Sequence, residues 1–240
     1  MLKKPLTCAG ALGKLNVHTK SGSYSQMKTK ALLLAGLVSL AGASVSEAQT
    51  VYSVNSVGYI NLTIPTGFSM IANQLFTSGS TIGEILPTPA VGTKFYKFNG
   101  TGFDISQYLG APFNAWFPNG SATLLPGEGG FLYNPAAPYT LTFTGEVPTG
   151  NLSNPLVAGF SIRSSIVPQS GALSSALGLP ATVGDKVYKY NGTSYDIYQL
   201  LGAPFNAWFP SEPSVNVGES FFVYKGTGTS WDRSFSIASN

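Results

Sequence analysis

Charge, cysteine and histidine are all scarce in this chain of 240 residues. Only 10% of its residues are Asp, Glu, Lys or Arg, whereas soluble proteins average about 25%. The chain has one cysteine and one histidine. So few charges exclude a polyelectrolyte tail, a coiled coil and a typical disordered segment. Hydrophobic residues make up 43% of the chain and aromatic residues 12%, which is enough for a packed core.

The segment 27–48 has the three parts of a secretory signal peptide. Two lysines precede an apolar run, and the segment ends on small residues that include Ser46 and Ala48. The apolar run is shorter than the roughly 20 residues that a membrane-spanning helix needs. We therefore expect cleavage after Ala48, a secreted protein in the extracellular space or cell envelope, and no membrane span in the mature chain.

Residues 1–26 are polar and basic and show no hydrophobic period. We interpret Met27 as the start of the protein and residues 1–26 as a mis-assigned extension. The alternative is a signal peptide with a long basic region before its apolar run.

Cleavage after Ala48 would remove Cys8 and His18, so the mature chain of 192 residues would contain neither residue type. A serine-histidine triad, a cysteine-histidine nucleophile and a zinc site of His or Cys would then be impossible. The leader also carries six lysines and one glutamate, which leaves seven basic and nine acidic residues and a net charge of −2. We expect no nucleic-acid binding, because no basic cluster remains, and we expect no cofactor and no metal.

The chain contains an internal duplication at an offset of 92 residues. Segment 94–118 reads KFYKFNGTGFDISQYLGAPFNAWFP, segment 186–210 reads KVYKYNGTSYDIYQLLGAPFNAWFP, and 19 of the 25 positions are identical. The last ten residues are the same in both, and we call them block 1 (109–118) and block 2 (201–210). The duplication predicts two modules, copy 1 (49–147) and copy 2 (148–240).

Each copy carries the signals of short strands. Asn99-Gly100 and Asn191-Gly192 separate aromatic-rich runs, a pattern that predicts a β-hairpin. Further β-branched and aromatic runs predict strands over 51–64, 129–134, 139–146, 158–163, 220–225 and 233–237. Only 80–86 and 172–177 look helical. We expect an all-β fold of two tandem, pseudo-symmetric modules, each sandwich-like or barrel-like. The alternative is one larger sandwich whose sheets the two copies share.

Three segments of copy 1 resemble an accessory module of secreted bacterial surface proteins. They are 67–73 (GFSMIAN), 96–100 (YKFNG) and 125–131 (LPGEGGF). The module has a G-F-x-x-I-x-N strand, a Y-x-F-N-G hairpin and a P-G-x-G-F-F-V segment, and the resemblance covers most of each copy. It implies a β-rich accessory or adhesive unit without assigned catalytic residues. Copy 2 departs from the pattern at 163–165 and 217–220.

The two blocks are the strongest candidates for a functional site, because they are identical while other segments of the copies have diverged. A tryptophan ring can stack on the apolar face of a sugar while an asparagine bonds its hydroxyls. The candidate residues are Phe113, Asn114 and Trp116 in block 1 and Phe205, Asn206 and Trp208 in block 2. The competing interpretation places these aromatics in the module cores or in an interface between the copies.

Four acidic residues recur at matching positions of the copies: Asp104 with Asp196, and Glu128 with Glu219. A glycosidase needs two carboxylates about 5 to 10 Å apart, and each copy offers one such pair. However, Asp104 follows a hairpin turn and Glu128 lies beside glycines, where acids commonly bond backbone amides. We regard the structural role as the better interpretation.

These observations favour a secreted, non-enzymatic β-repeat protein of the bacterial cell surface or extracellular matrix. We expect it to act by binding or assembly, with a polysaccharide, other envelope proteins or copies of itself as partners. One alternative is a purely structural, self-assembling envelope protein. Another is a histidine-free glycosidase or lyase that uses the paired carboxylates.

Overall fold

The computed structural model describes residues 56–237, which all belong to one compact unit, Ser53–Asn240. The expected extension (1–26) and signal peptide (27–48), with Cys8 and His18, lie outside the described residues. Those expectations stay predictions.

The described residues are almost entirely β structure, which confirms the expected fold class. They form 16 strands and one helix of four residues, α2 (Ile82–Ile85). Every strand pairing among them is antiparallel, and the sheets are open rather than closed into a barrel. Within this part of the chain no helix has the length and apolar character to cross a membrane.

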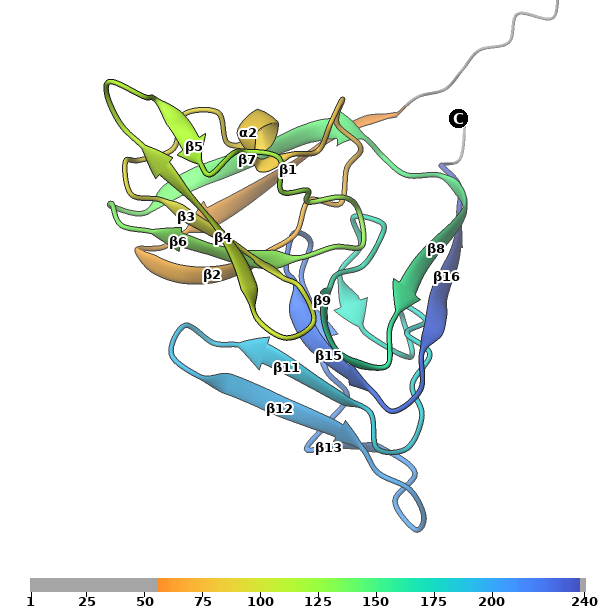
Figure 1. The fold of residues 1–240 in the computed structure, drawn as a ribbon. Helices are drawn as coiled ribbons and strands as arrows, with labels where there is room; N and C mark the ends of the chain where they lie inside the picture. Colours follow the sequence, from red (N-terminus) through yellow and green to blue (C-terminus); the bar gives the residue numbers. More distant parts are fainter. Residues whose placement is uncertain (1–55, 238–240) are drawn as a thin grey trace, which may run out of the picture. The chain divides into compact units, whose positions relative to one another are not determined.

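Copy 1 consists of a five-stranded sheet and a two-stranded ribbon (Figure 1). The sheet has the order β2 (Gly67–Ile71), β6 (Gly130–Asn134), β3 (Lys94–Phe98), β4 (Phe103–Leu109) and β5 (Ala115–Phe117), and the ribbon pairs β1 (Val57–Ile64) with β7 (Tyr139–Glu146). Strand β7 shows why the ribbon covers the sheet: Leu141 and Phe143 are buried, and the threonines that alternate with them are exposed. This alternation gives the strand one apolar face. That face packs with Phe95 and Leu132 of the sheet in one core.

Copy 2 repeats this sheet and ribbon and adds one short strand pair. Its sheet has the order β9 (Gly159–Arg163), β15 (Phe221–Lys225), β11 (Lys186–Tyr190), β12 (Tyr195–Leu200) and β13 (Trp208–Phe209). Its ribbon pairs β8 (Gly150–Leu156) with β16 (Thr229–Phe235). The short additional pair joins β10 (Gly171–Ala172) to β14 (Ser214–Val215). Trp231 of the ribbon is buried against Phe221 and Val187 of the sheet. Each named strand of the described chain pairs only within its own copy.

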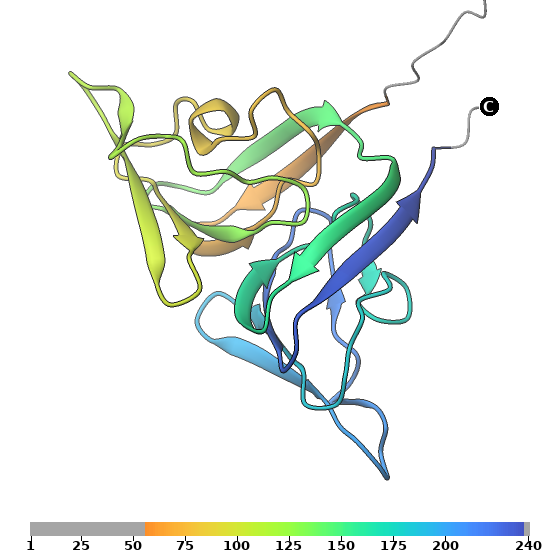
Figure 2. The same ribbon diagram turned by 45° about the vertical axis from the view of Figure 1, so that its right-hand side comes forward.

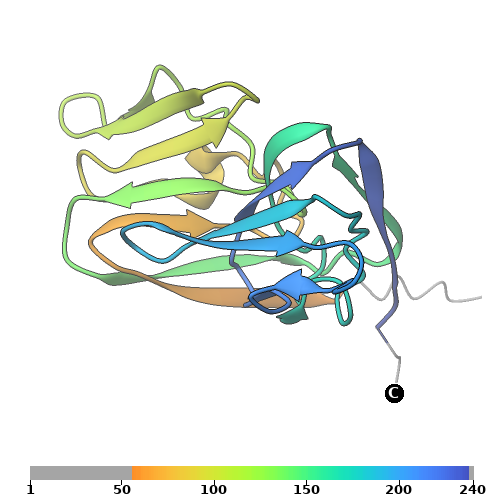
Figure 3. The same ribbon diagram turned by 90° about the horizontal axis from the view of Figure 1, so that it is seen from below.

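The two copies are joined by reciprocal contacts. Isolated β-bridges link Ile71 to Glu219 and Arg163 to Glu128. Ile71 and Arg163 occupy matching positions of the duplication, and so do Glu128 and Glu219. The same β-bridge therefore forms in both directions between the copies. Figure 3 shows the sheets of the two copies beside each other. This exchange is the pattern of a twofold interface between identical subunits, here built within one chain.

Aromatic side chains fill the space where the two sheets face each other. Phe131 of copy 1 and Phe222 of copy 2 lie 6.1 Å apart between ring centroids. Phe98 lies 5.3 Å from Phe222, and Tyr190 lies 5.4 Å from Phe131. With Met70 and Ile162, these rings form a third apolar cluster, separate from the cores of the two copies.

Some sequence-based expectations are wrong in detail. Segment 172–177 is not a helix: after β10 it forms turns, in which the Leu177 N–H donates to the Ala172 carbonyl at 2.9 Å. Ala172 pairs with Ser214 in β10, so the segment begins as a strand, and Gly178, with a positive φ of 69°, follows the turns directly. The carboxylate of the distant residue Glu212 accepts the N–H groups of Ser174 and Ser175. The other expected helix exists but is shortened to α2.

Two boundaries also differ from expectation. The last strand covers Thr229–Phe235 rather than 233–237, because it pairs along the whole of β8. The expected hairpin over 94–105 is present, but its loop has four residues rather than two. The Asn99 N–H donates to the Gly102 carbonyl at 3.0 Å, and the Asn99 side chain accepts the N–H of Gly102 at 2.8 Å.

Candidate ligand-binding site

Each block forms a loop and the short strand that follows it: residues 110–114 join β4 to β5, and residues 201–207 join β12 to β13. The Gly110 carbonyl accepts the N–H groups of Phe113 and Asn114 at 3.0 and 3.1 Å. Phe205 and Asn206 make the equivalent bonds to Gly202. Both asparagines have a positive φ, 46° and 45°, a conformation that asparagine tolerates better than most residues. The identical sequence therefore imposes an identical local structure.

The phenylalanines of the blocks project into solvent. Phe113 is 70% exposed and Phe205 is 71% exposed. Phe117 and Phe209, at the other end of each loop, are exposed as well. Figures 1 and 2 place the two loops, next to β5 and β13, on opposite sides of the described chain. The idea that the blocks meet each other between the copies is therefore wrong.

The two tryptophans of the blocks lie in different surroundings. Trp116 is only 7% exposed, its Nε1–H donates to the Leu86 carbonyl at 3.0 Å, and its ring packs edge-on with Tyr108. A sugar cannot stack on this ring without opening the core. Trp208 is half-buried, and its Nε1–H donates to Ser174 Oγ at 3.1 Å.

Trp208 and Asn206 line one open cavity of about 460 Å³. We call it the Trp208 cavity. Ser174 and Glu212 contribute to its wall. The Asn206 side-chain amide makes no hydrogen bond within residues 56–237, so its donor and acceptor face solvent. Two of the three candidate residues of block 2 are thus brought together with space for a ligand.

Glu212 gives this cavity a fixed negative charge. Burial opposes its ionisation, but hydrogen bonds from the backbone and hydroxyl of Ser175 and the backbone of Ser174 outweigh that effect and hold the pKa of Glu212 below its usual value. Both N–H groups lie 2.7 Å from the carboxylate. The sequence analysis missed Glu212 and Ser174, because they lie outside the block and 38 residues apart. The only signal in the sequence was an acid two residues after block 2.

The four recurring carboxylates are all engaged in turns or ion pairs. Asp104 and Asp196 accept hydrogen bonds from Asn99 and Asn191, the first residues of their hairpin loops, at 3.0 Å each. Glu128 pairs with Lys97 at 2.8 Å, and Glu219 pairs with Lys189 at 3.1 Å. Both glutamates also accept backbone N–H groups, from Leu125 and Asn216. This arrangement favours a structural role for these acids.

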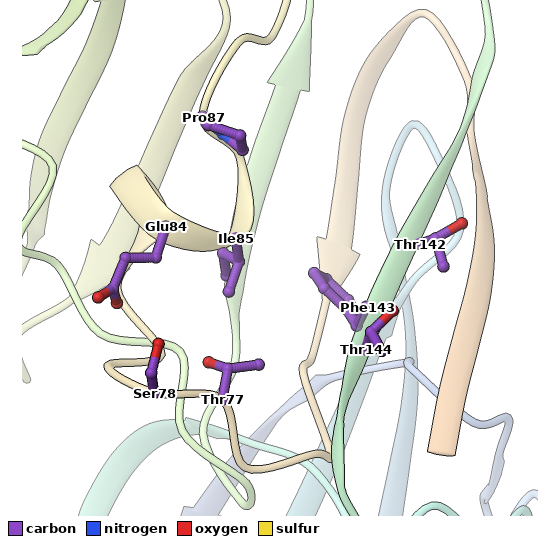
Figure 4. Close-up of a pocket in the computed structure, with 8 residues that line it drawn as sticks. All are labelled: Thr77, Ser78, Glu84, Ile85, Pro87, Thr142, Phe143 and Thr144. Atoms are coloured by element: carbon purple, nitrogen blue, oxygen red, sulfur yellow. The ribbon is translucent and has the colours of Figure 1, made fainter. Parts of the chain in front are cut away.

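A third group of polar residues surrounds a cavity of about 370 Å³ beside α2 (Figure 4). One wall comes from the segment that contains Thr77 and Glu84, and the other comes from β7. The Glu84 carboxylate caps the helix by accepting the backbone N–H and hydroxyl of Thr81 at 3.1 and 2.9 Å. Its charge is therefore used within the fold, and we assign no ligand to this cavity.

Comparison with known proteins finds no matching family model, no matching curated protein and no matching solved structure. Across residues 56–237, no three His, Cys, Asp or Glu side chains are grouped so that they could hold a metal ion. The function must therefore be inferred from the residues themselves.

Proposed function

We propose that the mature chain is a secreted, non-enzymatic binding protein of the bacterial cell surface or extracellular matrix, and that it binds a polysaccharide at the Trp208 cavity. The observation that supports this proposal is the pairing of a half-buried tryptophan with a free asparagine amide in one open cavity.

The chemistry of the cavity suits a sugar ring. The apolar face of a sugar packs on an aromatic ring, and its hydroxyls need donors and acceptors around the edge. The Trp208 ring supplies the first requirement, and the hydrogen bond to Ser174 fixes its orientation. The Asn206 amide supplies both a donor and an acceptor. Glu212, held ionised, adds an acceptor at the wall.

In copy 1 the tryptophan of the block is enclosed in the core. The Leu86 carbonyl accepts the indole N–H of Trp116, whereas the Ser174 hydroxyl accepts that of Trp208. We therefore propose one polysaccharide site of this kind in each chain rather than two.

The duplication supplies a matched control for the test. Affinity electrophoresis of the secreted chain in gels that contain xylan, mannan or β-glucan measures retardation by each polysaccharide. We expect Asn206→Ala to weaken retardation at least tenfold and Asn114→Ala, the same change in the identical loop of copy 1, to leave it unchanged. Trp208→Phe keeps an aromatic ring at the cavity and should weaken binding less than Asn206→Ala. Equal effects of the two alanine variants, or no retardation by any polysaccharide, would overturn the proposal.

A second candidate function is self-assembly, and the four exposed phenylalanines of the blocks favour it. Large exposed apolar side chains can mark a surface that associates with a partner. The two loops lie on opposite sides of the described chain (Figure 2), so homotypic contacts between loops of different chains would join copies in a row. Sedimentation velocity over a range of protein concentrations distinguishes this assembly from a monomer.

A further inference from the structure

Four aromatic rings of copy 1 form a closed circuit on the sheet face that meets copy 2. Centroid distances along the circuit are 5.5 Å from Phe68 to Tyr96, 6.1 Å from Tyr96 to Phe103, 5.9 Å from Phe103 to Phe131 and 6.2 Å from Phe131 back to Phe68. We call these four residues the aromatic box. They come from β2, β3, β4 and β6, so the sheet itself holds the box in place.

The walls of the box are inclined to one another. Neighbouring ring planes meet at 58°, 85°, 71° and 90°. Within the described residues, neither diagonal pair of the box makes a ring contact. A cation held against rings at these spacings lies inside the roughly 6 Å over which a ring face attracts a cation.

Copy 2 completes the site. Tyr190 and Tyr195 line the same cavity as the four rings of the box, and the cavity measures about 280 Å³. The Tyr190 hydroxyl donates to the Gly192 carbonyl at 2.6 Å, which holds this ring in place. Phe68, Phe103 and Tyr195 remain partly exposed, so a ligand can enter from solvent.

The chemistry of the lining selects the ligand. All six lining residues are aromatic, and none carries a formal charge. Lys97 and Lys189 are paired with Glu128 and Glu219, and neither lysine lines the cavity. Inclined ring faces cannot form the flat platform on which a sugar stacks, but they can surround a cation on several sides. A quaternary ammonium suits such walls best, because it has no N–H group that would need a hydrogen-bond partner in the cavity.

We propose that the aromatic box binds the trimethylammonium group of a choline-type ligand. This site is independent of the Trp208 cavity and of the polysaccharide proposed to bind there. The trimethylammonium group belongs either to a free small molecule or to a phosphatidylcholine headgroup, and both sources present the same chemistry to the rings.

Copy 2 contains a matching circuit of Phe160, Tyr188, Tyr195 and Phe222, with centroid distances of 5.6, 6.4, 6.0 and 6.4 Å. Phe98, which has no hydroxyl, takes the position there that Tyr190 takes beside the aromatic box. The cavity of about 280 Å³ opens on the copy 1 circuit, and we place the ligand there. Phe160 thus provides a matched control for Phe68, because it has the same place in its sheet but does not line this cavity.

Calorimetric titration of the secreted chain with choline, and with its uncharged isostere 3,3-dimethylbutan-1-ol, tests the proposal. We expect choline to bind at least tenfold more tightly than the isostere. Phe68→Leu keeps an apolar side chain but removes the ring face, so it should weaken choline binding at least tenfold and change isostere binding little. Phe160→Leu and Asn206→Ala should leave choline binding unchanged.

Flotation with vesicles of phosphatidylcholine or phosphatidylglycerol distinguishes the two sources. Binding to free choline alone identifies a small-molecule site, and additional flotation with phosphatidylcholine, lost in Phe68→Leu, identifies a headgroup site. Equal binding of choline and the isostere would overturn the proposal, and so would no choline binding or equal losses in Phe68→Leu and Phe160→Leu. Because Asn206→Ala tests the polysaccharide site separately, failure of one proposal does not imply failure of the other.

Discussion

The backbone N–H of Ser164 donates to the carbonyl of Gly127 at 3.0 Å, from copy 2 to copy 1. At the matching positions, Ala72 of copy 1 donates to Gly218 of copy 2 at 2.8 Å. The interface between the copies is thus made of one contact used twice, as in a dimer with twofold symmetry. One consequence is that the aromatic cavity, which needs rings from both copies, depends on these backbone bonds.

Asn154 supports one side of this interface. Its buried Nδ2 donates to the carbonyls of Gly127 and Ser164, at 3.3 and 3.0 Å. We expect Asn154→Ala to lower the free energy of unfolding by about 1 to 3 kcal/mol, because it leaves buried acceptors without a partner. Urea denaturation measures the change. Asn151→Ala, at an exposed position of the same strand, serves as the control, and equal losses would contradict this role of Asn154.

Asp185 and Lys225 form an ion pair that is almost completely buried. Thr93 and Asn134 hold the matching positions in copy 1, so only copy 2 carries this charge pair. We expect Lys225→Met to cost roughly 3 to 5 kcal/mol of unfolding free energy, because it leaves a buried carboxylate without its cation. Thr93→Ala, which breaks no ion pair at the matching position, should cost less. Similar losses in urea denaturation would show that the ion pair stabilises copy 2 no more than the neutral residues stabilise copy 1.

The same pair predicts a pH dependence of stability. Burial opposes ionisation of Asp185, but hydrogen bonds from Lys225, Thr182 and Gly226 outweigh it and lower its pKa. A lowered pKa in the folded state contributes stability that is present above the unfolded pKa and is lost as pH falls through the folded value. We therefore expect this stabilisation to decline below about pH 4. The Asp185→Asn variant should lack this part of the decline in stability at low pH. The Asp104→Asn variant, which changes an exposed aspartate, should keep it.

The tryptophans of the blocks should respond differently to truncation. Trp116→Ala should cost about 3 to 5 kcal/mol, the usual loss for a large core side chain. Trp208→Ala should cost less, because one side of its ring faces a cavity. Chemical denaturation of the two variants gives both values, and a larger loss for Trp208 would mean that its ring is a core element.

The exposed phenylalanines should contribute little to folding. We expect Phe113→Ser and Phe205→Ser to change the unfolding free energy by less than about 0.5 kcal/mol, as is usual for surface positions. If the chains associate through these loops, the same changes lower the sedimentation coefficient at high protein concentration. A large loss of stability in either variant would instead place these rings in the fold.

Runs of β-branched and aromatic residues were enough to predict most strands, and segment 139–146 became β7 with the expected boundaries. The identical sequence of the blocks also predicted one shared loop. It could not predict that Trp116 is buried and Trp208 is half-buried. That difference comes from the segments that cover the rings, around Leu86 and Ser174, and these segments have diverged between the copies.

The aromatic cavity was missed for a related reason. Its rings lie on strands of both copies, and only the packing of one sheet against the other brings them together. A signal existed in segment 94–98, where Phe95 alternates with Tyr96 and Phe98. Phe95 is buried in the core of copy 1, whereas Tyr96 and Phe98 belong to the cluster between the copies. A strand with aromatics on both faces indicates that both faces are covered.

Fluorine NMR of the secreted chain labelled with 5-fluorotryptophan tests the proposed function most directly. The described residues include all three tryptophans of the chain, and a Trp→Phe variant at each position assigns its signal. Addition of a polysaccharide that retards the protein in affinity electrophoresis should shift the Trp208 signal and leave the signals of the buried Trp116 and Trp231 in place. An unchanged Trp208 signal at saturating polysaccharide would contradict binding at the Trp208 cavity.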